Sequence, residues 1–166
     1  MGADKSRLRL GRRTLLGHVR AAANATGLPA RVIRSDVVPR CGPLGGVFSA
    51  LATSRAATIF FLSCDMPFVS PELLKMLGRR FKQGMAALFT EEGGRIGFPF
   101  LIQREILPVV ERQLTARRRS LRGLAEALDA RTFRVPRSRT HELFNVNTPG
   151  DLKIARDRWH GPARRA

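Results

Sequence analysis

The sequence is poor in carboxylates, cysteine and the larger aromatic side chains. Its 166 residues include 13 Asp and Glu against 30 Lys and Arg, with two Cys, one Trp and no Tyr. The cysteines, Cys41 and Cys64, form no metal-type spacing, and no export signal opens the chain, so we expect reduced thiols. The longest uncharged apolar stretch, Ala56–Cys64, is far too short to span a bilayer. We therefore expect a cytoplasmic protein without a membrane partner.

The net charge of +17 favours anionic partners in general. A nucleic-acid binder usually adds a stacking platform or a reading helix. Here there is no Tyr, and most Phe residues lie inside apolar runs. A bias in codon composition is an alternative explanation for the excess of Arg over Lys. We expect no specific nucleic-acid binding, although a basic nucleic-acid-binding protein remains one alternative.

Helical and strand patterns alternate along the chain, which predicts an α/β fold with a mostly parallel sheet covered on both faces. We find no linker or repeat, so residues 1–166 are expected to form a single domain, with 160–166 as a disordered basic tail. The expected helices are Arg13–Thr26, Leu44–Ser54, one starting at Ser70-Pro71-Glu72, Leu107–Leu114, Ser120–Leu128 and one from Thr148 to Trp159. The expected strands are Ala30–Ser35, Thr58–Ser63, Met85–Phe89, Thr132–Val135 and Leu143–Val146, with a turn at Glu91–Arg95.

One carboxylate, Asp65, follows the apolar run Ala56–Cys64 directly and is followed by Met66-Pro67. Such a short, Ile- and Phe-rich run predicts a strand buried on both faces. In open α/β sheets, ligands bind just beyond the carboxyl ends of the strands. Asp65 is therefore a candidate site residue, and the alternative is that it caps the turn after the strand.

Three further segments each have two interpretations, one as part of a ligand-binding site and one as ordinary local structure. Cys41–Gly46 is glycine-rich and leads into a helix, which suits a bound anion or only a tight loop. Asn145 and Asn147 occupy alternate positions of an expected strand, where their amides suit a polar ligand or form a turn. Lys5 is either a phosphate contact or part of a solvated terminus.

Taken together, four stretches resemble the molybdenum cofactor guanylyltransferase family, within the nucleotidyltransferases of Rossmann-like fold. The resemblance covers nearly all of the chain. It is carried by Met1–Lys5 with Leu8 and Leu10, Gly42–Gly46, Cys64–Phe68, and Asn145–Pro149 with Asp151-Leu152. It implies a Rossmann-like, mostly parallel sheet with helices on both faces.

The resemblance also implies the residues of the site. The nucleotide would be bound by Lys5, Asp36, Gly45 and Asp65. Lys5 and Asp65 would be the catalytic pair, with Asp65 holding Mg²⁺. Asn145 and Asn147 would lie on the pterin side.

The implied reaction is transfer of GMP from GTP to the phosphate of molybdopterin, with release of pyrophosphate. Other molybdenum cofactor biosynthesis proteins are possible partners. A cytidylyl-type relative acting on the same cofactor is the near alternative.

Two departures from the family pattern support a further alternative, an inactive or vestigial nucleotide-binding protein. Family members carry a strand and a Leu-Ala-Gly-Gly-x-Ser-x-Arg loop before the stretch that matches Met1–Lys5, so we expect the first strand and the Gly-rich loop to be missing here. Between Gly27 and Asp36 only one short strand fits, where many relatives have two.

Overall fold

The computed structural model describes residues 7–33, 37 and 41–160, and the chain divides into two compact units. Unit 1 comprises Met1–Ala30, Leu62–Leu74 and Pro136–Ala166, and unit 2 comprises Arg31–Phe61 and Lys75–Val135. The expected basic tail lies, beyond its first residue, outside the described residues. No helix in the described part of the chain has the length and apolarity needed to cross a membrane.

Unit 2 is built on a four-stranded sheet in the order β3-β5-β4-β6. Three strands, β3, β4 and β6, run in one direction, and β5 lies antiparallel between β3 and β4. Most strands therefore share the expected direction, but only β4 and β6 form a directly bonded parallel pair. The strands are β3 (Thr58–Phe61), β4 (Ala87–Glu92), β5 (Arg95–Gln103) and β6 (Arg131–Arg134).

Strand β5 is the main element that the sequence patterns did not predict. The expected turn at Glu91–Arg95 is shorter in the structure, because Glu92 already pairs with Arg95. Only Gly93 and Gly94 join the strands, with φ of +55° and +75°. Two successive positive φ angles suit a two-residue hairpin turn, and glycine adopts them without a steric cost. The hairpin brings β5 back antiparallel to β4.

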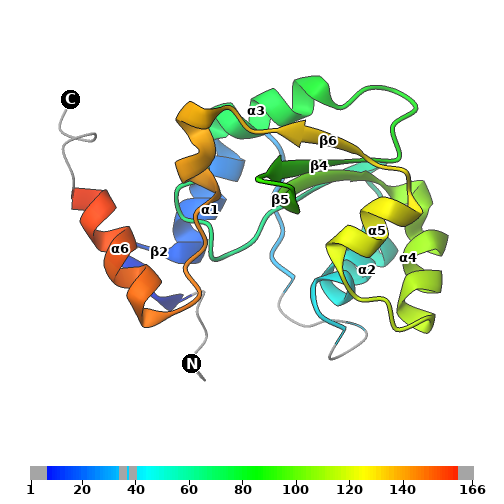
Figure 1. Cartoon of the computed structure of the whole chain (residues 1–166), viewed down its shortest axis with the longest axis horizontal. Helices are drawn as coiled ribbons and strands as arrows, with labels where there is room; N and C mark the ends of the chain where they lie inside the picture. Colours follow the sequence, from blue (N-terminus) through cyan, green and yellow to red (C-terminus); the bar gives the residue numbers. More distant parts are fainter. Residues whose placement is uncertain (1–6, 34–36, 38–40, 161–166) are drawn as a thin grey trace. The chain divides into compact units, whose positions relative to one another are not determined.

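Helices cover both faces of this sheet, as expected (Figure 1). On one face, Phe61 and Phe89 flank Phe100 with ring centroids 4.9 and 4.8 Å apart. Against them pack apolar residues of α2 (Pro43–Thr53), α4 (Leu107–Thr115) and α5 (Leu121–Ala127). On the other face lies α3 (Pro71–Arg80), where a Cβ at Gly78 would be 3.7 Å from the Phe60 ring. A short 3-10 helix, η2 (Arg104–Ile106), links β5 to α4.

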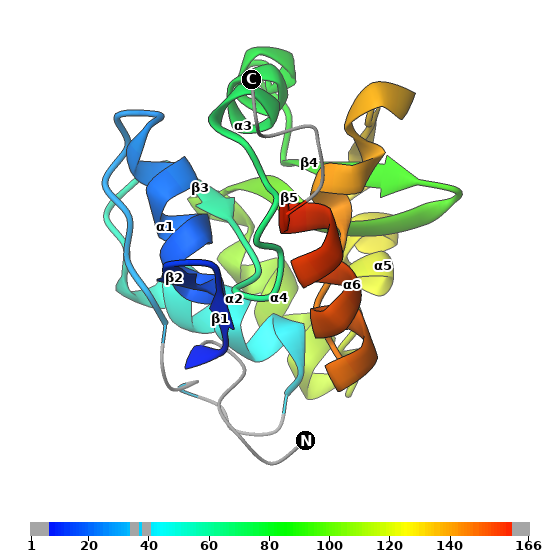
Figure 2. The same cartoon turned by 90° about the vertical axis from the view of Figure 1, so that its left-hand side faces the viewer.

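Unit 1 has a small core of its own. A two-stranded hairpin, β1 (Arg9–Leu10) and β2 (Arg13–Thr14), leads into α1 (Leu15–Asn24), as Figure 2 shows. The remaining elements are η3 (Arg137–Leu143), a 3-10 helix, and α6 (Pro149–His160). Four apolar side chains form the fully buried centre: Leu10, Leu15, Val146 and Ala155.

Two of the expected strands are wrong. Residues 30–33 form no strand, and residues 34–36 lie outside the described part of the chain. The segment expected as Leu143–Val146 begins with the last residue of η3 and continues without a strand partner. There, the Val146 amide donates one backbone hydrogen bond to the Asp65 carbonyl (2.9 Å), and the described residues of this segment form no ladder of hydrogen bonds between strands. A strand is defined by such a ladder, which apolar residues alone do not supply.

The turn between β1 and β2 predicts a specific steric effect. Gly11 has a φ of +60°, and a Cβ there would lie 2.6 Å from Trp159 Nε1. We expect Gly11→Ala to lower the free energy of unfolding by about 1–3 kcal/mol more than Gly94→Ala, since overpacking adds to the cost of positive φ. Gly94 is the matched control, because its φ is +75° and no atom lies within 4 Å of its Cβ position.

Urea unfolding followed by the fluorescence of Trp159, the sole tryptophan, measures the difference. Equal losses in the two variants would contradict the close approach of Gly11 to the indole.

Candidate functional site

Asp65 lies in the turn that follows β3, within unit 1, and its carboxylate is only partly engaged by the protein. The Ser63 hydroxyl donates to Asp65 Oδ1 at 2.6 Å. Among the described residues, no backbone N–H donates to this carboxylate, so its contact with the turn runs through the Ser63 side chain. The second oxygen, Oδ2, accepts no hydrogen bond from them either. The half-buried carboxylate therefore has one oxygen oriented by the protein and one available to a ligand.

Ser63 is a site residue that the sequence patterns missed. Its hydroxyl orients Asp65, yet it lies in the last part of an apolar run, where a serine carries no recognisable motif. Its two-residue spacing from an acid is the one available signal, because Ser and Asp side chains at this spacing readily bond to each other in a turn.

The structure brings Asp65 and the two predicted asparagines together within unit 1, on two segments that a backbone hydrogen bond joins. The Val146 amide donates to the Asp65 carbonyl at 2.9 Å. Val146 is fully buried, whereas Asn145 and Asn147 on either side of it are exposed. The backbone between the asparagines is thus bonded to the backbone of Asp65, and both amide side chains lie on the solvent side.

The position of Asn147 is fixed by the start of α6. Asp151 Oδ2 accepts from the amides of Asn147 and Thr148, at 2.9 and 2.8 Å. In return, the Asp151 amide donates to the Thr148 hydroxyl oxygen at 3.1 Å. This is a reciprocal capping arrangement in which Thr148 is the helix cap. The Asn145 side chain is held separately, because its Nδ2 donates to the Leu143 carbonyl at 3.2 Å.

The remaining predicted site residues lie elsewhere or outside the described part of the chain. Gly45 is in unit 2, buried in the first turn of α2, where its amide donates to the Gly42 carbonyl at 3.1 Å. Helix α2 begins at Pro43, one residue before the expected Leu44, and Gly42 before it has a φ of +58°. Lys5 and Asp36 lie outside the described residues.

The carboxylate of Asp65 fits a metal that is shared with a substrate. Residues 7–33, 37 and 41–160 contain no group of three or more His, Cys, Asp or Glu side chains arranged to hold a metal. Mg²⁺ does not need such a group, because it commonly takes one or two carboxylates together with phosphate oxygens and waters. The open oxygen of Asp65 therefore suits Mg²⁺ that arrives with a phosphate ligand.

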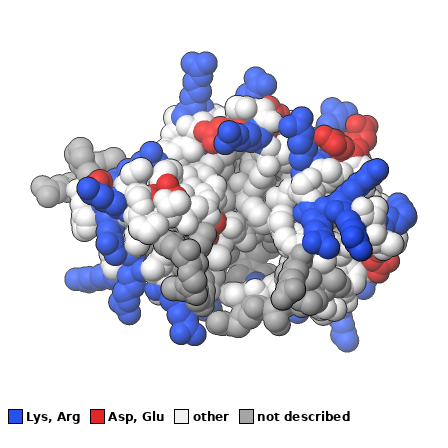
Figure 3. Space-filling view, turned by 60° about the horizontal axis from the view of Figure 1, so that its bottom comes forward, with Lys and Arg blue, Asp and Glu red and all other residues white. Residues whose placement is uncertain are grey.

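Basic side chains outnumber acidic ones on one face of the molecule. Figure 3 shows Lys and Arg side chains projecting mainly around the edge of that face, with several acidic patches among them. Such a surface attracts anions, and the attraction weakens as salt rises.

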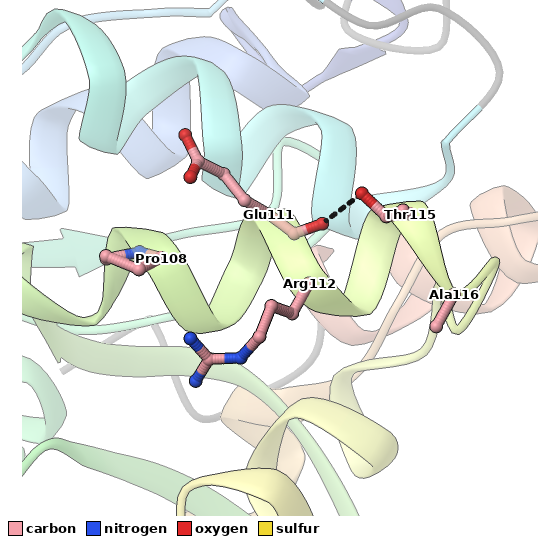
Figure 4. A pocket seen from close by; sticks show the side chains of 5 residues that line it. All are labelled: Pro108, Glu111, Arg112, Thr115 and Ala116. Carbon is pink, nitrogen blue, oxygen red and sulfur yellow. Dashed lines mark hydrogen bonds between the residues drawn. The ribbon is translucent and has the colours of Figure 1, made fainter.

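Two hollows lie within single units. One, of about 440 Å³, runs along α4 in unit 2 (Figure 4), where the Thr115 hydroxyl donates to the Glu111 carbonyl at 3.0 Å. It contains none of the predicted site residues. The other, of about 760 Å³, lies in unit 1 and is lined by Phe68 from the Cys64–Phe68 stretch and by Trp159.

Comparisons with known proteins point to one family. Residues 1–132 match the model of the MobA-like NTP transferase domain. A molybdenum cofactor guanylyltransferase from Pseudomonas putida is 37% identical over 115 residues, which cover 68% of this chain and 59% of that protein. The chain thus spans about three fifths of the length of this curated relative.

Solved structures show the same α/β nucleotidyltransferase fold. Molybdopterin-guanine dinucleotide biosynthesis protein A from Archaeoglobus fulgidus superimposes with a TM-score of 0.70 at 23% identity, covering 94% of this chain and 90% of that one. A Mycobacterium tuberculosis protein solved as a complex with manganese superimposes with a TM-score of 0.65 at 20% identity, covering 94% and 93%. The expected fold class is confirmed.

The capping arrangement at α6 predicts the effect of removing Asp151. We expect Asp151→Ala to lower the free energy of unfolding by about 1 kcal/mol, because two amides at the helix start lose their acceptor. Asp157→Ala is the matched control, since Asp157 is exposed on the same helix. Thermal unfolding of both variants measures the difference, and an equal change in melting temperature would show that the cap contributes nothing.

Proposed function

Because the chain belongs to the MobA-like NTP transferase family, we propose that it transfers GMP from GTP to the phosphate of molybdopterin. The observation that carries this proposal is Asp65, whose carboxylate is oriented by Ser63 and keeps one oxygen open to a ligand. In the reaction, a phosphate oxygen of molybdopterin bonds to the α-phosphorus of GTP. The bond from that phosphorus to the α–β bridging oxygen breaks, and pyrophosphate leaves with the electron pair.

This chemistry needs no general base from the protein. The attacking phosphate is already an anion, so catalysis consists of positioning and charge neutralisation. The histidines are consistent with this: His18 is buried, and its Nε2 lies 2.8 Å from the Leu10 carbonyl oxygen in the core of unit 1. His141 and His160 are exposed and occupy no catalytic arrangement among the described residues.

The roles of the site residues follow from their chemistry. Asp65 would hold Mg²⁺, and Lys5 would place a cation beside the phosphate charge that develops. Asp36 and Gly45 would contact the nucleotide. Asn145 and Asn147 would face the pterin, to which amides can both donate and accept hydrogen bonds.

Asp65 would hold the divalent ion, which when bound would supply positive charge to neutralise the phosphates. A solved protein with this fold contains manganese, which supports a divalent ion of this class; we propose Mg²⁺. The basic surface would help to collect two anionic substrates. We place the protein in the cytoplasm, alongside other proteins of molybdenum cofactor biosynthesis.

Replacing the Asp65 carboxylate tests the proposal directly. We expect Asp65→Asn to lower the rate of Mg²⁺-dependent pyrophosphate release by at least about a hundredfold, because an amide cannot neutralise the metal. Far-UV circular dichroism should be unchanged, since Asn can still accept from the Ser63 hydroxyl. Asp157→Asn is the matched control and should retain full activity. Unchanged turnover in Asp65→Asn would refute the assignment of Asp65.

The choice of nucleotide needs a second experiment. We expect GTP to bind at least about tenfold more tightly than CTP at equal Mg²⁺, a difference of about 1.4 kcal/mol. Isothermal titration with both nucleotides measures it. A preference for CTP would favour the cytidylyl-type alternative, and binding without turnover would favour the vestigial one. Salt-sensitive binding of RNA or DNA without a response to GTP would favour the nucleic-acid alternative.

A further inference from the structure

Glu142 is a buried carboxylate that lies outside the predicted site. It is 3% exposed, in η3 of unit 1. Arg139 Nη1 donates to Glu142 Oε1 at 2.6 Å, which is also an ion pair. The Ser70 amide donates to Glu142 Oε2 at 2.9 Å. Both carboxylate oxygens therefore accept a hydrogen bond. Oε1 accepts from the charged Arg139, and Oε2 accepts from the backbone of a segment distant in sequence.

The distant segment is the start of α3. Ser70 caps this helix, because its hydroxyl oxygen accepts from the Leu73 amide at 3.1 Å. Arg139 also donates to the Ser70 hydroxyl oxygen, at 3.3 Å. Ser70, Arg139 and Glu142 thus form a connected cluster, which we call the η3 clamp. Hydrogen bonds to an ionised group are about twice as strong as neutral ones.

The η3 clamp holds the loop that contains Asp65. Three hydrogen bonds join this loop, residues 63–70, to the segment 139–146. The Val146 amide donates to the Asp65 carbonyl, the Ser70 amide donates to Glu142, and Arg139 donates to the Ser70 hydroxyl oxygen. Within the loop, two backbone hydrogen bonds are long. The Met66 amide lies 3.4 Å from the Ser63 carbonyl oxygen, and the Val69 amide lies 3.3 Å from that of Met66. The loop therefore depends on partners outside itself for its conformation.

Burying a carboxylate is a poor way to gain stability, since its desolvation can exceed the Coulomb gain from its partner, here Arg139 with 32% of its side chain accessible. The cluster is better explained by the position that it fixes. We infer that Glu142 is a positioning residue, which through Ser70 sets the conformation of the loop and thereby the orientation of the Asp65 carboxylate toward Mg²⁺ and nucleotide. This inference rests on the proposed function of Asp65.

The test compares Glu142→Gln with Glu126→Gln. Gln keeps the volume of Glu142 and an acceptor for the Ser70 amide, but it removes the charge that pairs with Arg139. Glu126 is the matched control, because it pairs with Arg122 in an exposed i,i+4 ion pair whose side chains are 74% and 68% accessible. Glu142→Ala would remove the acceptor of the Ser70 amide and leave Arg139 with its bond to the Ser70 hydroxyl oxygen. It is the more severe second variant.

Two quantities are measured on the native chain and both Gln variants. The first is the Mg²⁺ dependence of turnover. We expect Glu142→Gln to raise the half-saturating Mg²⁺ concentration and to lower kcat, each by about tenfold, because small displacements of a positioned group are costly. A purely structural loss of folded protein would lower the rate without shifting the Mg²⁺ midpoint. Glu126→Gln should change neither.

The second quantity is hydrogen exchange at the Ser70 amide, which requires no substrate. We expect exchange about tenfold faster in Glu142→Gln, since its acceptor is then neutral. An unchanged Mg²⁺ midpoint in an active Glu142→Gln protein would overturn the inference, whatever its exchange rate.

The two proposals can fail separately. If the native chain transfers no guanylyl group, the proposed function fails. The positioning role is then decided by exchange alone: faster exchange at Ser70 in Glu142→Gln supports the clamp, and unchanged exchange overturns it. If the native chain is active and Glu142→Gln has an unchanged Mg²⁺ midpoint, the proposed function stands and the positioning role of Glu142 does not.

Discussion

The hydrogen bond from the Val146 amide to the Asp65 carbonyl is the contact on which the arrangement of the site depends. Segments 62–74 and 136–166, far apart in sequence, belong to one compact unit, and this bond joins their backbones beside the proposed metal ligand. Because Val146 is fully buried in the core of unit 1, the bond is also protected from water. A backbone bond shielded in this way persists, since breaking it would leave a buried amide without a partner.

Helix boundaries and the site motifs could be predicted from the sequence, because their signals are local. Ser70 and Thr148 cap helices that begin with proline, and each cap is satisfied within three residues of itself. Asp65 was also recognisable, since an acid directly after a short apolar run is unusual. The expected burial of that strand on both faces was wrong, because β3 is an edge strand in which only Phe61 is buried. The Cys64–Phe68 and Asn145–Pro149 stretches added the family resemblance that the comparisons confirm.

What the sequence did not reveal depends on contacts between distant segments. Strand β5 has no alternating pattern, because Phe100, Leu101 and Ile102 are all buried. Successive apolar side chains on both faces give no period of two, and such a run cannot be told from other buried segments by pattern alone. Asn147 was predicted to lie in a strand. In the structure, its backbone amide instead donates to Asp151 at the start of α6. Glu142 gave no signal, since a lone acid in a basic stretch is usually solvated.

Carboxylates are scarce in this chain. Their hydrogen-bond donors distinguish those that stabilise the fold from Asp65, which is proposed to bind a ligand. Asp151 and Glu142 each accept from backbone amides that would otherwise lack a partner, so their charge stabilises the chain itself. Asp65 accepts only from a serine hydroxyl among the described residues and keeps one oxygen open. Alone, this anion would repel a phosphate, which makes it a poor element of a surface otherwise suited to anions. Under the proposed function, Asp65 would hold a divalent ion, which would supply the positive charge that a bound phosphate needs. The open oxygen of Asp65 is consistent with that role, and the hydrogen bonds of Val146 and Glu142 hold the loop on which Asp65 lies.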